Sequence, residues 1–221
     1  MTRTLFTGNR NASSWAFRAW LALKEVNIAF REECIDIRRP QRWDNLQRIG
    51  RFSPPAAVPV LDDNGFIIWD SLAIMEYAND LSDGQLMPTD LQQRAKARAF
   101  VSWQHSTFAR VCPALSFEST FYPNKKTLSW VEREDILEIY DLWESTISTF
   151  DGPYLIGHYS LADIMLLPSV LRFSSHLPVD HRHPGVRNWI EQLLNRPHVT
   201  EWLSEAYEQE PIYLPGYRDA G

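Results

Sequence analysis

The strand-like patterns of this chain stop about a third of the way along it. Within the first eighty residues, short apolar or alternating runs (4–8, 28–37, 57–61 and 66–69) alternate with segments of helical spacing (14–25, 41–50 and 70–80). Beyond residue 90 only helical patterns follow, to about residue 210. The sequence therefore predicts an α/β unit with the order β-α-β-α-β-β-α, followed by an all-α unit. We expect domains at 1–80 and 91–221, joined by a linker at 81–90 that carries Pro, Gly and Asp.

Local signals support this division. The dipeptide Asn64-Gly65 lies between two strand-like runs and predicts a hairpin turn. In the second half, an apolar stripe at steps of three and four predicts a helix over 128–150 with its buried face on Ile136, Tyr140, Trp143, Ile147 and Phe150. Pro113 is expected to bend or end the helix before it, because proline has no amide hydrogen to donate.

Composition excludes several classes of protein. The net charge of -6 comes without a long basic run, which argues against nucleic acid and anionic membranes as partners. No apolar segment is long enough to span a bilayer, so we expect a soluble, cytoplasmic protein. Two cysteines make no disulfide framework; Cys34 is expected in strand core and Cys112 in helix packing. The six histidines predict no metal site, and the cluster at 181–183 is interpreted as an exposed turn before Pro184.

Two adjacent serines stand before the first predicted helix. Ser13 and Ser14 can serve as ordinary helix caps, or one hydroxyl can meet a reactive group of a ligand at the helix N-terminus. A hydrolase nucleophile is not indicated, because no Gly-x-Ser-x-Gly turn surrounds them.

Pro59 interrupts a strand-like run, although proline cannot donate to a sheet ladder. Two arrangements satisfy it: an edge strand with a trans bond, or a cis Val58-Pro59 bond that leaves the Val58 backbone free for a ligand. A few residues later, Asp70 and Ser71 open a predicted helix. They are either a plain N-cap or a site for an α-amino acid group, in which the helix end and the hydroxyl hold a carboxylate and the Asp holds an ammonium.

Together these segments resemble the glutathione S-transferase family. "SSWAFR", "SPPAAVPVL" and "DSLAI" are similar to parts of its N-terminal thioredoxin-like domain, while "GHYSLADIMLLPSV" (157–170) and "RNWIEQLLNRPHV" (187–199) are similar to helices of its C-terminal domain. The resemblance covers about residues 4 to 205. In the 157–170 segment, Ser160 as N-cap and Asp163 three residues later also form a capping box, so we interpret Asp163 as structural rather than catalytic.

The resemblance implies roles for particular residues. The bond before Pro59 would be cis, with Val58 pairing to the cysteinyl backbone of glutathione, and Asp70 with Ser71 would hold the γ-glutamyl end. One serine would donate a hydrogen bond to the sulfur; we favour Ser13, with Ser14 capping the helix, although the spacing to Arg18 also allows Ser14. The arrangement is most similar to the zeta class, but Trp15 stands where that class often has Cys. Without a cysteine at either serine position, disulfide exchange is not expected.

The function implied is a glutathione transferase, acting in detoxification, that activates the thiol for attack on a hydrophobic electrophilic small molecule. The alternatives are a glutathione-dependent cis-trans isomerase of the maleylacetoacetate type and a non-catalytic protein-interaction module. The resemblance also implies a homodimer, formed by the third helix of one chain against the second domain of another. Candidates for contact with the electrophile are Trp15, Trp103, His105, Ser106 and Arg110. Those for the glycyl end of glutathione are Gln41, Arg42 and Gln47.

Overall fold

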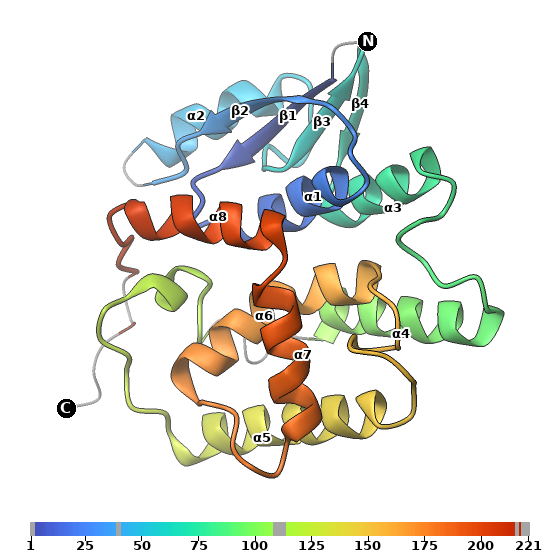
Figure 1. Cartoon of the computed structure of the whole chain (residues 1–221). Helices are drawn as coiled ribbons and strands as arrows, with labels where there is room; N and C mark the ends of the chain where they lie inside the picture. The colour runs from blue at the N-terminus through green and yellow to red at the C-terminus, as the bar shows by residue number, and fades with distance from the viewer. Residues whose placement is uncertain (1–2, 39–40, 108–113, 215–216, 218–221) are drawn as a thin grey trace.

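The computed structural model describes residues 3–38, 41–107, 114–214 and 217 (Figure 1). A sheet with its helices comes first and a helical bundle follows, which confirms the predicted fold class of a thioredoxin-like domain and an all-α domain. The elements of the first part are β1 (Arg3–Gly8), α1 (Ser14–Glu25), β2 (Arg31–Ile35), α2 (Arg42–Gly50), β3 (Val60–Asp63), β4 (Phe66–Trp69) and α3 (Ser71–Leu81).

The four strands lie in the order β2-β1-β3-β4, with β1 parallel to β2 and β3 antiparallel to both of its neighbours. Helices α1 and α3 cover one face of this sheet and α2 covers the other (Figure 1). The α2 face has its own small core, in which Leu46 and Ile49 pack with Ile35 and Val60. On the opposite face, the core of α1 and α3 is continuous with that of the helical bundle.

Two strands differ from their predicted bounds. β3 starts at Val60 rather than at residue 57, because Pro59 has no amide hydrogen for the ladder, and it extends to Asp63, which pairs with Phe66 across the hairpin. β2 covers 31–35 instead of 28–37 and lies at the edge of the sheet. The prediction that Cys34 belongs to the strand core is wrong: its side chain is exposed, because Ile35 is the residue that turns toward α2.

The second part consists of α4 (Leu91–Thr107), a short 3-10 helix η1 (Glu118–Phe121), α5 (Trp130–Ile147), α6 (Leu161–His176), α7 (Pro184–Leu194) and α8 (Pro197–Glu208). Among these elements α6 is the centre, since every residue from 161 to 173 is buried. Within the described residues, none of the helices combines the length and the hydropathy needed to cross a bilayer. Arg110, Cys112 and Pro113, for which the sequence made predictions, lie outside the described residues.

The capping box predicted for α6 is present. Asp163 accepts a hydrogen bond from the Ser160 amide at 2.8 Å, and its other carboxylate oxygen accepts from the Trp189 indole at 2.8 Å. Burial raises the pKa of this carboxyl group, although the hydrogen bonds that it accepts oppose the rise. Because these partners come from α6 and α7, the contacts support the structural interpretation of Asp163.

Two further predictions concern the helical part. Helix α5 is shorter than the predicted 128–150, but the stripe is confirmed as core, since Ile136, Tyr140 and Trp143 are wholly buried. The exposed turn predicted at 181–183 is correct only for its first two residues. His183 is 1% exposed and lies between two carboxylates, with Asp141 at 2.7 Å and Asp180 at 3.1 Å. It is buried because it is the N-cap of α7, which packs against α5.

Candidate functional site

Two adjoining cavities, of about 450 and 330 Å³, lie where the sheet domain meets the helical bundle. Their linings share four residues, and the cavities therefore form one cleft: Trp15, Ala57, Val58 and His105. The six residues proposed for thiol activation and for the main glutathione contacts line this cleft: Ser13, Ser14 and Val58 in the larger part, and Val58, Pro59, Asp70 and Ser71 in the smaller part. The folded chain thus brings together residues from three separate sequence segments.

The two serines have different partners. Ser13 is the N-cap of α1, and its hydroxyl oxygen accepts a hydrogen bond from the Ala16 amide at 3.3 Å. Ser14 is the first helical residue, and its hydroxyl oxygen accepts from Nη2 of Arg172 at 3.0 Å. The prediction that Ser14 caps the helix is therefore wrong, since the cap is Ser13. A hydroxyl that accepts a hydrogen bond keeps its own proton, so both serines can still donate to a ligand in the cleft.

Arg172 is a charged residue of the site that the sequence analysis missed. It comes from the buried helix α6, is only 8% exposed, and its guanidinium lies 5.7 Å from the centre of the Phe117 ring. Its Nε is buried and has no hydrogen-bond partner among the described residues. One signal in the sequence could have indicated it, namely a single cation within the mostly apolar helix α6.

Three other charged residues line the larger part of the cleft: Arg18, Arg42 and Glu118. Arg42 extends into it from the start of α2, whereas Gln41 and Gln47, the other candidates for the glycyl end of glutathione, are exposed and line neither cavity. Glu118, on η1, is the second residue that the sequence analysis missed. Burial raises the pKa of its carboxyl group, although its own backbone amide and the positive charge of Arg172 oppose the rise.

The smaller part of the cleft is built around the start of α3. Asp70 has a φ of 80° and is the N-cap, with one carboxylate oxygen accepting from the Leu72 amide at 2.8 Å and the Ala73 amide at 3.2 Å. Its other oxygen lies 3.9 Å from Nε2 of His105 on α4. Ser71 is 2% exposed, and its hydroxyl has no hydrogen-bond partner among the described residues. Asp70 therefore caps the helix, and next to it the buried hydroxyl of Ser71 has no partner among the described residues.

Val58 lies between the two parts and lines both. The Val58-Pro59 peptide bond is cis, which confirms the geometry that the resemblance implied. Two of the predicted electrophile contacts also lie here, since Trp15 and His105 line both parts and meet edge to face with ring centres 5.7 Å apart. Trp103 and Ser106 line neither cavity; Trp103 packs against Phe100 instead.

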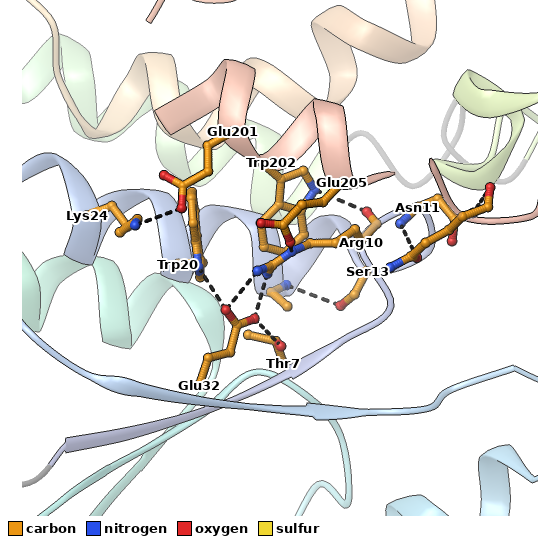
Figure 2. Close-up of polar contacts among 12 residues, drawn as sticks. Thr7, Arg10, Asn11, Ser13, Trp20, Lys24, Glu32, Glu201, Trp202 and Glu205 are labelled. Atoms are coloured by element: carbon orange, nitrogen blue, oxygen red, sulfur yellow. Dashed lines mark hydrogen bonds and ion pairs between the residues drawn. The ribbon is translucent and has the colours of Figure 1, made fainter. Parts of the chain in front are cut away.

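The loop that leads to Ser13 is held by residues from distant parts of the chain. Arg10 binds Glu32 on β2 and Glu205 on α8, at 2.5 and 2.7 Å, and its backbone carbonyl accepts from the Trp202 indole at 3.1 Å (Figure 2). Next to it, Asn11 donates to the backbone carbonyl of Glu210 at 2.9 Å. These contacts fix the start of α1 against both the sheet and the last helix.

A thioredoxin-like sheet joined to a helical bundle, with a cleft between them at the starts of α1 and α3, defines a two-domain protein of the thioredoxin-fold class. Comparison with known proteins identifies the family within that class. Residues 12–81 match the glutathione S-transferase N-terminal domain, and residues 114–206 match its C-terminal domain. This chain belongs to the glutathione S-transferase family.

Individual relatives agree with this assignment. The chain is 24% identical over 185 residues to mouse glutathione S-transferase theta-1, covering 79% of this chain and 75% of the relative. It is 28% identical over 171 residues to a probable maleylacetoacetate isomerase of Caenorhabditis elegans, covering 75% and 76% of the two chains. Among solved structures, glutathione transferase E6 of Drosophila melanogaster superposes with a TM-score of 0.71 at 26% identity, covering 94% of this chain and 93% of the other.

Proposed function

We propose that this protein is a glutathione transferase that ionises the thiol of glutathione in the cleft and directs it at an electrophilic small molecule. One observation carries the proposal: the N-termini of α1 and α3 open onto the same cleft, one with two serine hydroxyls and the other with the free hydroxyl of Ser71. Helix N-termini favour anions, and glutathione has a carboxylate at its γ-glutamyl end and a thiolate in its middle.

The cleft suggests where each part of glutathione binds. The γ-glutamyl carboxylate accepts a hydrogen bond from the Ser71 hydroxyl at the start of α3. The ammonium pairs with Oδ2 of Asp70, the oxygen that does not cap the helix. The cysteinyl backbone lies against Val58, which borders both parts of the cleft. Of the three residues considered for the glycyl carboxylate, Arg42 is the one that lines the cleft, and we therefore assign this contact to it.

The sulfur then lies at the start of α1. A free thiol has a pKa near 8.5, so only a few per cent is thiolate at neutral pH. Lowering this pKa by about two units needs roughly 2.7 kcal/mol. A hydrogen bond to a charged group supplies about 1.5–3 kcal/mol and a helix end about 0.3–1 kcal/mol, so Ser13 and the α1 terminus together reach that value. Arg172, which donates a hydrogen bond to Ser14 at 3.0 Å, adds a positive charge that also stabilises the thiolate.

The electrophile would occupy the remainder of the larger cavity. Besides Val58 and two alanines, its apolar lining consists of Trp15, Ile37, Leu46 and Phe117, which come from both domains. Such a wall favours hydrophobic molecules over highly charged ones. The thiolate forms a bond to the electrophilic carbon, and the electron pair displaced from that carbon leaves with a leaving group or takes up a proton.

A second candidate function is the glutathione-dependent isomerisation of a cis double bond, as in a maleylacetoacetate isomerase. The observation that favours it is the buried, unpartnered Nε of Arg172, which offers a donor to an acidic substrate of that kind. Glutathione would then add to the substrate and leave again. Turnover of many substrate molecules per glutathione would establish isomerisation, whereas one glutathione consumed per product would establish conjugation.

We also propose a cytoplasmic homodimer with a role in detoxification. In support of the dimer, four apolar side chains are exposed on β4, at the end of α3 and at the start of α4, where polar side chains would be expected to face solvent: Phe66, Trp69, Leu81 and Leu91. These positions suit packing of α3 against the second domain of another chain. Sedimentation equilibrium at micromolar concentration would give the mass of two chains, and the mass of one chain would contradict this proposal.

The proposed glutathione site is tested by Ser71→Ala, with Ser53→Ala as a matched control. Both serines are buried with unpartnered hydroxyls, but Ser53 lines neither cavity. Because neither hydroxyl makes a hydrogen bond, we expect each change to alter the free energy of unfolding by less than about 1 kcal/mol. Only Ser71→Ala should weaken glutathione binding measured by calorimetry, by about tenfold or more, since it removes a donor to a carboxylate.

Equal affinity for glutathione in wild type and Ser71→Ala would contradict the placement of the γ-glutamyl end. No binding to the wild type at millimolar glutathione would instead favour the remaining alternative, a protein-interaction module on the same fold.

A further inference from the structure

The wall of the larger cavity contains a carboxyl group that the proposed thiol chemistry does not use. Among the described residues that line this cavity, Glu118 is the only acid. It lies on η1, whose end is fixed by Lys125: the ammonium donates to the carbonyls of Ser119, Thr120 and Tyr122 at 2.9, 2.8 and 2.7 Å. These hydrogen bonds therefore hold the segment that carries Glu118 at a defined position in the cavity wall.

The groups around Glu118 connect it to the serines. Arg172 of α6 and Arg42 of α2 act on it with positive charge, and Tyr122 follows it at the end of η1. Arg172 also donates to the Ser14 hydroxyl at 3.0 Å. Arg172 thus contacts the serine end of the cavity, where the sulfur is expected, while its charge also acts on the Glu118 carboxyl group, and all of these residues line the cavity in which an electrophile would fit.

Given the proposed function, on which this inference rests, we propose that Glu118 is the general acid for the electrophile. When the thiolate adds to an activated double bond, a carbon–sulfur bond forms and the π electron pair moves onto the far end of the conjugated system. Glu118 transfers its proton to that atom and becomes a carboxylate beside Arg172. It regains a proton from water, which has received the proton released by the next glutathione thiol, so that charge and atoms balance over a cycle.

The protonation that this role requires fits the surroundings. Burial raises the pKa of Glu118, although its own amide and Arg172 oppose the rise, so a larger fraction carries a proton near neutral pH than in an exposed glutamate. The positive charge of Arg172 stabilises the carboxylate that remains after transfer. A general acid in such a position typically accelerates a reaction by a factor of about a hundred or more.

The test compares two probe electrophiles in wild type and Glu118→Gln. A neutral aryl enone needs a proton on the atom that gains charge, whereas chlorodinitrobenzene loses chloride and needs none. We expect Glu118→Gln to lower kcat/KM for the enone by about tenfold or more while changing kcat/KM for chlorodinitrobenzene by less than about twofold. The intact chloride displacement also shows that the variant is folded and binds glutathione. Glu138→Gln, the same change at an exposed position on α5, should alter neither reaction.

The pH dependence gives a second readout that a purely structural role would not change. Dividing kcat/KM for the enone by kcat/KM for the chloride displacement at each pH removes the effect of thiol ionisation. In the wild type this ratio should fall as the pH rises through the pKa of Glu118, and in Glu118→Gln it should not change. Equal losses for both electrophiles, no loss for either, or a wild type that conjugates only chlorodinitrobenzene would overturn the role of Glu118. A wild type that binds no glutathione and conjugates neither electrophile would refute the proposed function as well, and the calorimetry on Ser71 would show it separately.

Discussion

Ser13 provides the sharpest test of how the thiol is activated, because its hydroxyl has two separable roles. As the N-cap of α1 it accepts a hydrogen bond from the Ala16 amide at 3.3 Å, and its own proton remains available for the sulfur. Ser13→Ala removes both. Loss of the cap should lower the free energy of unfolding by about 1 kcal/mol. Loss of a hydrogen bond to a thiolate, about 1.5–3 kcal/mol, should raise the pKa of the bound glutathione thiol by about one to two units.

The two effects are separated by a control elsewhere in the chain. Ser129 is the N-cap of α5, and its hydroxyl accepts from the Glu132 amide at 3.3 Å, the same length as in Ser13. Ser129→Ala should therefore reproduce the loss of stability in urea unfolding without any change at the cleft. The thiol pKa is measured from the ultraviolet absorbance of the thiolate as the complex with glutathione is titrated.

A thiol pKa in the Ser13→Ala complex that equals the wild-type value would refute the reasoning for Ser13. Should Ser14→Ala raise the pKa instead, the donor is Ser14, whose hydroxyl is held by Arg172.

Two further predictions concern stability. Arg10→Gln removes a guanidinium that is 11% exposed and pairs with Glu32 and Glu205, so the free energy of unfolding in urea should fall by about 3 kcal/mol. Lys24→Gln breaks a more exposed pair with Glu201 and should lower it by less than about 1 kcal/mol. Equal effects of the two changes would contradict the importance of burial. Hydrogen bonding to Arg38 lowers the pKa of Asp36 to about 2, below its value in the unfolded chain. The wild type should therefore melt at a higher temperature than Asp36→Asn above about pH 5, and this difference should disappear as the pH falls toward 2. A difference in melting temperature that is independent of pH would contradict this.

The elements of the fold were largely predictable because each carries its own periodicity. The stripe on α5, the capping box of α6 and the hairpin at Asn64-Gly65 depend on residues that are close in sequence, and all three are present. The bounds of β3 were predicted less well, since the place where pairing begins depends on how Pro59 meets the ladder of its neighbour.

The cleft was predictable only in part. The six residues proposed for thiol activation and glutathione binding lie at the starts of helices or strands. There the local sequence pattern already indicates a cap or an unusual backbone, and all six line the cleft. Glu118 was missed because nothing near it in sequence indicates a site, and Arg172 because its one signal, a cation in a mostly apolar helix, does not show what it contacts. Arg172 reaches Ser14 across 158 positions of the chain, a contact that depends on how α6 crosses α1. The N-cap of α1 was predicted at Ser14 but is Ser13. This is an error of one residue, and helical periodicity does not define helix ends that closely.

The contacts of the loop before Ser13 have a consequence for how the protein is made. Glu205 and Glu210, which hold Arg10 and Asn11, lie 195 and 199 positions after them, so they leave the ribosome long after the loop that they hold. A nascent chain can form the sheet early, but the start of α1 acquires these contacts only after α8 and Glu210 have been synthesised. A chain released before Glu205 would thus form a sheet whose loop before Ser13 lacks these contacts, and Ser13 and Ser14 would be present without being held in position.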